Sequence, residues 1–99
     1  MEKAGLAAAE LARTLLAETE CAILVLVGPG NNGGDAMVAA RHLKRWWYRV
    51  TVVFTGSREK LPPDASAACN AWLASGGELV SVIPANQHFG LVIDGLFGI

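Results

Sequence analysis

Apolar residues recur at two different spacings along the chain, and these spacings predict which segments form helices and which form strands. From residue 4 the apolar positions follow a helical period with charged residues on the other side, which predicts an amphipathic helix through about Ala17. Residues 22–27, which read AILVLV, are continuously apolar and followed by Gly-Pro-Gly, as is typical of a parallel strand buried on both faces. A second helical period runs from Met37 to Trp46, with cations near its C-terminal end, where they complement the helix dipole.

The rest of the chain continues the alternation of strands and helices. We expect a strand at 50–54, a helix at 64–75 N-capped by Asp64, a third strand at 79–83 and a short fourth strand at 91–94. Right-handed crossovers with helices on one face give the order 3-2-1, and a reversal then places the fourth strand beside the first. The pattern therefore predicts an α/β fold with a mainly parallel sheet in the order 3-2-1-4.

Composition narrows the class of protein. The 99 residues are 53% hydrophobic and 17% charged, which predicts one folded domain. A net charge of -1 without a basic stripe argues against nucleic acid as a partner. The longest apolar run, Cys21 to Val27, falls well short of the roughly 20 residues of a membrane span, and the N-terminus does not resemble a signal peptide. We therefore expect no membrane partner, a cytoplasmic location, and buried free thiols at Cys21 and Cys69 rather than a disulfide.

Two polar segments follow neighbouring strands at the edge where parallel sheets bind ligands. One is the loop 28–35, GPGNNGGD, after the first strand, and the other is Asp94 at the end of the fourth. The loop fits the G-x-G-x-x-G spacing of a dinucleotide fingerprint, but Asp35 at the expected helix N-terminus would repel a pyrophosphate, and residues 54–58 at the end of the second strand contain no acid to bind a ribose. We expect Asp35 to satisfy the helix dipole and its first N–H groups, leaving the Asn side chains and loop amides to face a ligand.

Asp94 has three interpretations that the residues alone leave open. It can cap a turn at Gly95, it can carry a proton if leaving the apolar strand desolvates it, or it can join Asn32 as a pair of hard oxygen ligands for a cation.

Several motifs together resemble one family. The helix opening MEKAG at 1–5, the run VGPGNNGGD at 27–35, the following VAARHL at 38–43 and the segment VIDGLFG at 92–98 are similar to the YjeF N-terminal domain, the NAD(P)H-hydrate epimerase family. The motifs occur in family order and span the whole chain.

The resemblance implies a Rossmann-like, three-layer αβα fold and an isomerase that interconverts the R and S epimers of hydrated NADH or NADPH. It implies substrate contacts from the loop, a potassium ion held by Asn32 and Asp94, and a further substrate loop beginning at Gly98. Asp94 is then the expected catalytic residue, because epimerisation needs proton transfer and charge stabilisation. The implied substrate-binding residues are Asn31, Asn32, Gly33, Gly34, Asp35 and Gly98.

The chain departs from the family pattern in length and at three positions. Family domains are about twice as long, so residues 1–99 are expected to be a partial domain that lacks an N-terminal helix and the C-terminal half and has little activity alone. Ala36 stands where Gly is usual, Gly95 where Ala is usual, and Trp47 where a helix-ending Gly is common. For Trp47 we weigh a partly exposed ring against a subunit or domain contact.

Further expectations concern assembly and the remaining polar residues. The resemblance implies a homo-oligomer, and a fusion to an ADP- or ATP-dependent dehydratase domain in bifunctional repair enzymes. The alternative functions are a non-catalytic interaction or dimerisation module, and a ligand-binding Rossmann-like domain. His42 is expected on the surface or facing the helix dipole rather than in catalysis. Ser57, Arg58 and Lys60 are interpreted as a solvated loop, with contact to a 2'-phosphate as the alternative.

Overall fold

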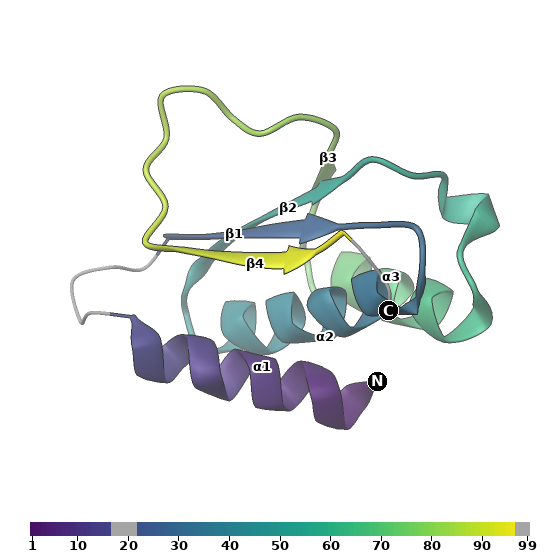
Figure 1. The fold of residues 1–99 in the computed structure, drawn as a ribbon, viewed down its shortest axis with the longest axis horizontal. Helices are drawn as coiled ribbons and strands as arrows, with labels where there is room; N and C mark the ends of the chain where they lie inside the picture. The colour runs from purple at the N-terminus through teal and green to yellow at the C-terminus, as the bar shows by residue number, and fades with distance from the viewer. Residues whose placement is uncertain (17–21, 97–99) are drawn as a thin grey trace.

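The computed structural model describes residues 1–16 and 22–96 and has an α/β fold with a parallel sheet (Figure 1). The described strands lie in the order β3-β2-β1-β4, as the sequence predicts. Figure 1 shows the helices together on one face of the sheet, so they supply one helical layer of the expected architecture. The elements in chain order are α1 (Glu2–Leu15), β1 (Ala22–Val27), α2 (Asn31–Arg45), β2 (Arg49–Phe54), the 3-10 turn η1 (Arg58–Lys60), α3 (Pro63–Ala74), β3 (Leu79–Val80) and β4 (Leu91–Gly95).

Strand β1 is the centre of the sheet, and its register fixes where the polar segments lie. Val25 pairs with Val52 of β2 on one side and with Ile93 of β4 on the other, both in parallel. Every residue of β1 except Leu26 is buried, which confirms the prediction from its continuous apolar run. In the same register Val27 lies beside Gly95, so the chain leaves β1 and β4 at the same edge.

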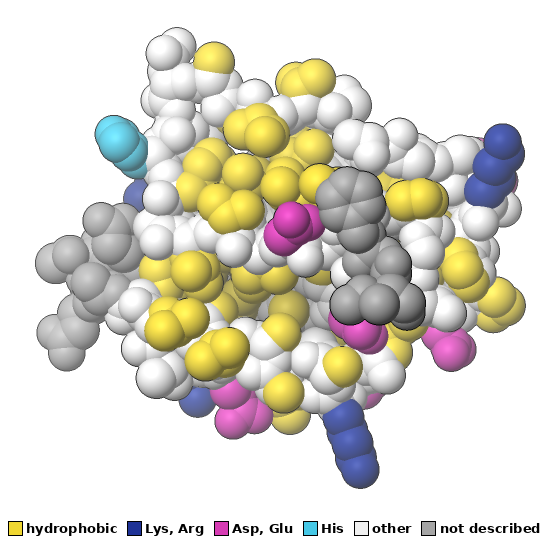
Figure 2. Space-filling view, viewed as in Figure 1, with side chains coloured by type: hydrophobic (Ala, Val, Ile, Leu, Met, Phe, Trp, Pro, Cys, Tyr) yellow, Lys and Arg dark blue, Asp and Glu magenta, His cyan; other side chains and the backbone are white. Residues whose placement is uncertain are grey.

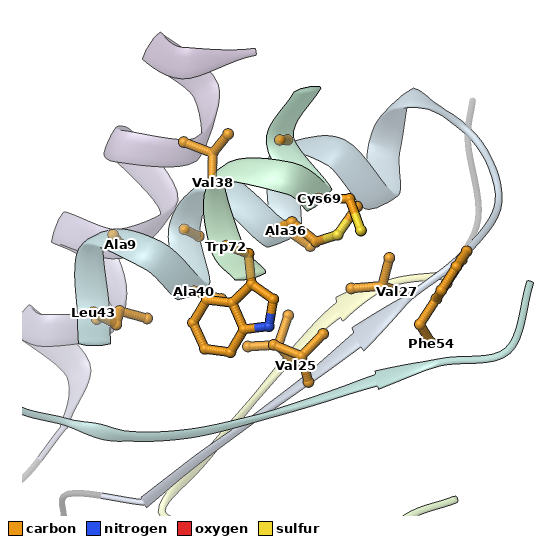
Figure 3. Close-up of a cluster of buried hydrophobic side chains, with 14 of the residues drawn as sticks. Ala9, Val25, Val27, Ala36, Val38, Ala40, Leu43, Phe54, Cys69 and Trp72 are labelled. Atoms are coloured by element: carbon orange, nitrogen blue, oxygen red, sulfur yellow. The ribbon is translucent and has the colours of Figure 1, made fainter. Parts of the chain in front are cut away.

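Helix α2 forms the middle of the helical layer, because it contacts α1, α3 and the strands β1, β2 and β4. Figure 3 shows the core beneath it, with Val25 and Val27 of β1 facing the helices and Trp72 of α3 among them. The Trp72 indole N–H donates to the carbonyl of Glu78 at 3.0 Å, which ties α3 to the segment that enters β3. Cys69, also on α3, is buried as a free thiol, as predicted, whereas Cys21 lies outside the described residues.

Three element boundaries differ from the predictions. Helix α2 begins at Asn31, so the Asn and Gly residues expected in a loop form its first turn. Asp64 is not the N-cap of α3: Pro62 holds that position and Pro63 starts the helix, where its missing N–H costs no hydrogen bond. The third strand ends at Val80 rather than Ile83, and the last apolar residues expected in it, Val82 and Ile83, are 71% and 55% exposed.

Apolar side chains gather on the part of the surface that lies over the strands: Figure 2 shows them across the middle of the view, over the strands of Figure 1. Val92 of β4 is about half exposed, and no helix covers this side of the sheet among residues 1–16 and 22–96. In the same ranges, no helix is long and apolar enough to cross a membrane.

The sequence leads to predictions for two residues near the end of α2, His42 and Trp47, and the structure shows where both lie. His42 lies in the last turn of α2, where a cation faces the helix dipole as one of the two expectations had it, but it is buried rather than on the surface; its ring lies 6.0 Å from that of Trp46. Trp47 follows the helix with φ 73° and is 91% exposed, so its ring packs on little of the described chain. A positive φ is favourable for Gly and costly for other residues, which accounts for Gly being common here in the family that the sequence resembles.

Candidate functional site

The turn after β1 is built from glycines that let three backbone segments meet. A Cβ on Gly28 would collide with the Leu96 carbonyl, and a Cβ on Gly33 would collide with the Gly28 carbonyl. The Gly28 N–H donates to the Gly95 carbonyl at 2.9 Å. The turn after β1 is therefore held directly against the end of β4, with no room for a side chain between them.

The first turn of α2 places its polar residues differently from the prediction. Asn31 to Gly34 form this turn, the Gly33 N–H donates to the Gly30 carbonyl at 3.1 Å, and no side chain caps the helix. Asp35 comes one residue too late to lie in the first turn, which contains no acid. The expectation that Asp35 satisfies the helix dipole and the first N–H groups is therefore wrong, because the helix starts four residues earlier than the sequence indicates.

A hollow of about 210 Å³ at the carboxyl edge of the sheet collects most of the predicted side chains. Asn32 and Asp35 of α2 and Asp94 of β4 line it together. The carboxyl ends of β1 and β4, where the strand order reverses, are where open parallel sheets bind ligands. The other lining residues are small or apolar: Ala4, Ala8, Ala36, Ile93 and Gly95.

The remaining predicted site residues lie around this hollow rather than in its lining. Asn31 is exposed. Gly33 and Gly34 are buried, and a Cβ on Gly34 would meet the Met1 side chain, with its Sδ at 2.8 Å, so these two residues contribute backbone and close packing. Gly98 lies outside the described residues.

Helix α1 supplies a wall of the hollow that the sequence did not predict. Ala4 and Ala8, one helical turn apart, face it from α1. Their small size was visible in the sequence, but nothing there distinguished them from the other alanines of the apolar stripe.

Asp94 is oriented by the backbone that follows it. Its Oδ1 accepts a hydrogen bond from the Leu96 N–H at 3.0 Å, which confirms the turn-capping interpretation. The side chain is exposed among the described residues, so these residues supply none of the desolvation that the proton-carrying interpretation considered. An ionised carboxylate offers about four acceptor positions, so the cap leaves most of them available for a ligand.

The donor set of the hollow suits a cation that prefers oxygen. Asn32 offers an amide oxygen and Asp94 carboxylate oxygens, which are hard ligands. Within 1–16 and 22–96, no group of three or more His, Cys, Asp and Glu side chains is arranged to hold a metal. The two residues therefore fit an ion that completes its shell with backbone carbonyls and water.

A larger hollow of about 470 Å³ lies near Trp47 and Trp72, at the end of the sheet where β2 begins. We place the candidate site at the carboxyl edge instead, because the predicted polar side chains converge there and strand order reverses there.

A parallel sheet in the order β3-β2-β1-β4, with a glycine-rich turn after its central strand and an acid at the end of the neighbouring strand, gives the chain a Rossmann-like α/β fold, a class in which ligands bind at this edge. The chain belongs to the family described as YjeF-related protein N-terminus, which matches residues 1–99. The residues that carried the resemblance thus identify the family correctly.

Named relatives give the comparison more detail. The chain is 48% identical over 99 residues to the NAD(P)H-hydrate epimerase of Bordetella pertussis, covering all of this chain and 42% of that protein. It is 41% identical over 103 aligned positions to a bifunctional NAD(P)H-hydrate repair enzyme of Leishmania braziliensis, covering 99% of this chain and 18% of that one. A crystal structure of the yeast protein Ynu0 superposes with a TM-score of 0.78 at 28% identity, over 98% of this chain and 45% of the yeast chain. The chain therefore spans less than half the length of these relatives.

Proposed function

We propose that this chain forms the part of an NAD(P)H-hydrate epimerase that carries the glycine-rich turn and the catalytic carboxylate of Asp94. The reaction would interconvert the R and S epimers of hydrated NADH or NADPH. The names of the relatives support this assignment, and the observation that carries it is the convergence of Asn32, Asp35 and Asp94 on one hollow at the carboxyl edge.

In this proposal Asp94 is the catalytic residue. Epimerisation at the hydrated ring carbon needs a group that moves a proton and stabilises developing charge. The carboxylate of Asp94 is exposed to the hollow, and the Leu96 N–H fixes one of its oxygens, so the other remains available to the substrate. The Asn31 to Asp35 segment would bind the substrate beside it.

We further propose that Asn32 and Asp94 hold a potassium ion. When bound, the ion would supply positive charge next to the substrate. The oxygen donors on the two elements that line the hollow support this assignment. In this proposal Asp94 has two roles: its carboxylate binds the potassium ion, and it also accepts a proton from the substrate.

The first test is Asp94→Asn in the full-length protein. The Asn amide oxygen can still accept the Leu96 N–H, so the turn is kept while the carboxylate is removed. We expect kcat for epimerisation of the purified R or S hydrate to fall by about 100-fold or more. Asp64→Asn, an exposed acid in the first turn of α3, is the matched control and should leave the rate unchanged. An unchanged rate in Asp94→Asn would remove this residue from the mechanism.

The second test addresses the ion. We expect epimerisation to rise when NaCl is replaced by KCl at constant ionic strength, and the rise to disappear in Asn32→Ala. A rate that is the same in both salts would contradict the potassium assignment. The catalytic role of Asp94 would then be decided by the Asp94→Asn variant alone.

A non-catalytic interaction module is the alternative function, and the names of the relatives do not favour it. The bifunctional Leishmania relatives also support a proposal for longer forms of this protein, in which a second repair domain is joined to the same chain.

A further inference from the structure

We propose that Ala36 and Gly95 are positioning residues: the single methyl group between them sets how far Asn32 stands from Asp94. This inference rests on the proposed function in one respect, which is that the distance between Asn32 and Asp94 matters because the two residues bind potassium. The observation behind it is a steric one at the floor of the hollow, where α2 crosses the end of β4.

The space between the two elements holds one methyl group and no more. Gly95 is buried, and a Cβ built on it would lie 2.7 Å from the Ala36 Cβ, closer than real Cβ atoms approach. The same Cβ would lie 3.0 Å from the Leu26 carbonyl oxygen and 3.2 Å from that of Asn32. Ala36 is itself 4% exposed, so its methyl group fills the space opposite Gly95.

The contact lies on the same two elements as the two proposed oxygen ligands. Asn32 precedes Ala36 by four residues and so shares its face of α2, and Asp94 precedes Gly95 on β4. All four residues line the same hollow. Because α2 carries Asn32 and Ala36 while β4 carries Asp94 and Gly95, a change in the distance between α2 and the end of β4 also changes the distance between Asn32 and Asp94.

The surrounding backbone leaves β4 little freedom to yield. The Gly28 N–H binds the Gly95 carbonyl at 2.9 Å, and Gly28 already touches the Leu96 carbonyl too closely for a side chain. A second methyl group at position 95 would have to push the N-terminal part of α2, which includes Asn32 and Ala36, away from β4, because the turn after β1 blocks the other direction. The first turn carries Asn32, so the pair of ligands would separate.

The experiment compares Gly95→Ala, Ala36→Gly and the double variant, with Gly30→Ala as a control. A Cβ on Gly30 meets nothing within 4 Å, so the control adds a methyl group to the same turn without a collision. The side-chain signals of Asn32 (its NH2 group) and Asp94 (its carboxyl carbon) in two-dimensional NMR spectra report the geometry of the pair without any ligand, and a change of the neighbouring residue type affects them less than backbone amides. We expect both to shift in Gly95→Ala, to return most of the way in the double variant, and to stay in place in Gly30→Ala.

A potassium titration provides the functional reading. If the ion binds, Gly95→Ala should weaken its apparent affinity by about tenfold, as is typical when a residue that positions a metal ligand is changed. The double variant should recover most of that loss, because it carries one methyl group in the same space. The residual contacts of the new Cβ with the two carbonyl oxygens make this recovery incomplete.

The outcomes separate the inference from the proposed function. Asn32 and Asp94 signals that are unchanged in Gly95→Ala, or a double variant as perturbed as the sum of its two single changes, would overturn the positioning role. If the signals shift and return as expected while no form of the protein responds to potassium, the positioning role stands and the potassium assignment fails.

Discussion

Arg41 donates a hydrogen bond from Nη2 to Oε1 of Glu2 at 2.6 Å, and this ion pair joins the first turn of α1 to α2. The Arg41 side chain is 22% exposed and that of Glu2 is 67% exposed, so the pair lies at the boundary of the interface between the helices. The other carboxylate oxygen of Glu2 lies 3.6 Å from Nε2 of His42. Because α1 forms a wall of the hollow through Ala4 and Ala8, these contacts also hold that wall in place.

Glu2→Gln should lower the free energy of unfolding by about 0.5 kcal/mol, since a partly exposed ion pair contributes little more than that. The loss should shrink at high salt, which screens the charges. Urea unfolding at low and high salt measures both effects. Glu10→Gln is the control on the same helix, because no ion pair of Glu10 is found in the part of the chain that the structure describes. Equal effects of the two substitutions would contradict a specific role for Glu2.

Gly5→Ala should destabilise the protein even though Ala is the better helix former. A Cβ at this buried position would collide with the Val38 side chain and lie 2.9 Å from the Asp35 carbonyl oxygen. We expect a loss of about 1–3 kcal/mol in the free energy of unfolding, typical of overpacking. Adding Val38→Ala should recover part of the loss by making room. An increase in stability in the single variant would show that the helices separate at no cost.

Trp47→Gly should stabilise the protein. Trp47 holds φ 73°, a conformation that costs a residue with a Cβ about 1–2 kcal/mol and costs Gly little, and its exposed ring gives up few contacts. We expect a gain of about 1 kcal/mol, reduced by the greater chain entropy of Gly when unfolded. Trp47→Ala loses the same ring but keeps the strained Cβ, so it should show no gain. The melting temperatures of the two variants decide the matter, and equal values would show that backbone strain is not the cause.

Glu59 supplies a prediction for pH. The Ser57 hydroxyl donates to its carboxylate, and this hydrogen bond, with smaller contributions from the Glu59 backbone N–H and the charge of Arg58, lowers the pKa of Glu59 below its ordinary value of 4.5. Because the folded state has the lower pKa, the stabilisation is present above the unfolded pKa and is lost as the pH falls through the folded one. Ser57→Ala should raise the pKa of Glu59 towards its ordinary value in an NMR titration. A titration curve that does not move would show that the hydroxyl does not bind the carboxylate in solution.

The central part of the fold could be predicted because its sequence signals are strong. The continuous apolar run of β1 requires burial on both faces, and the short connections of the following units leave few topologies. The start of α2 could not be predicted in the same way. Asn31 to Gly34 are poor helix formers, and they become helical because Gly33 and Gly34 allow the first turn to pack against Gly28 and Met1. Those contacts are tertiary and leave no local signal.

The candidate site shows the same division. Asn32 and Asp94 follow neighbouring strands, so their meeting at one edge could be inferred from strand order. The burial of His42 could not, because it depends on where α1 crosses α2. The sequence also presents Ala36 and Gly95 as two separate departures from the family pattern. In the structure they face each other, so Gly at 36 with Ala at 95 would place one methyl group in the same gap.

Cys69 gives the chain an internal reporter. Its thiol is 1% exposed in the core beneath α3, so a thiol reagent reaches it only when that part of the core opens. Cys21→Ser removes the other thiol, so the alkylation rate of Cys69 in native buffer would measure how readily this part of the core opens. Comparing this alkylation rate among variants would distinguish two kinds of substitution. One that loosens α3 should raise the rate, and one that acts only where α2 packs against α1 should leave it unchanged.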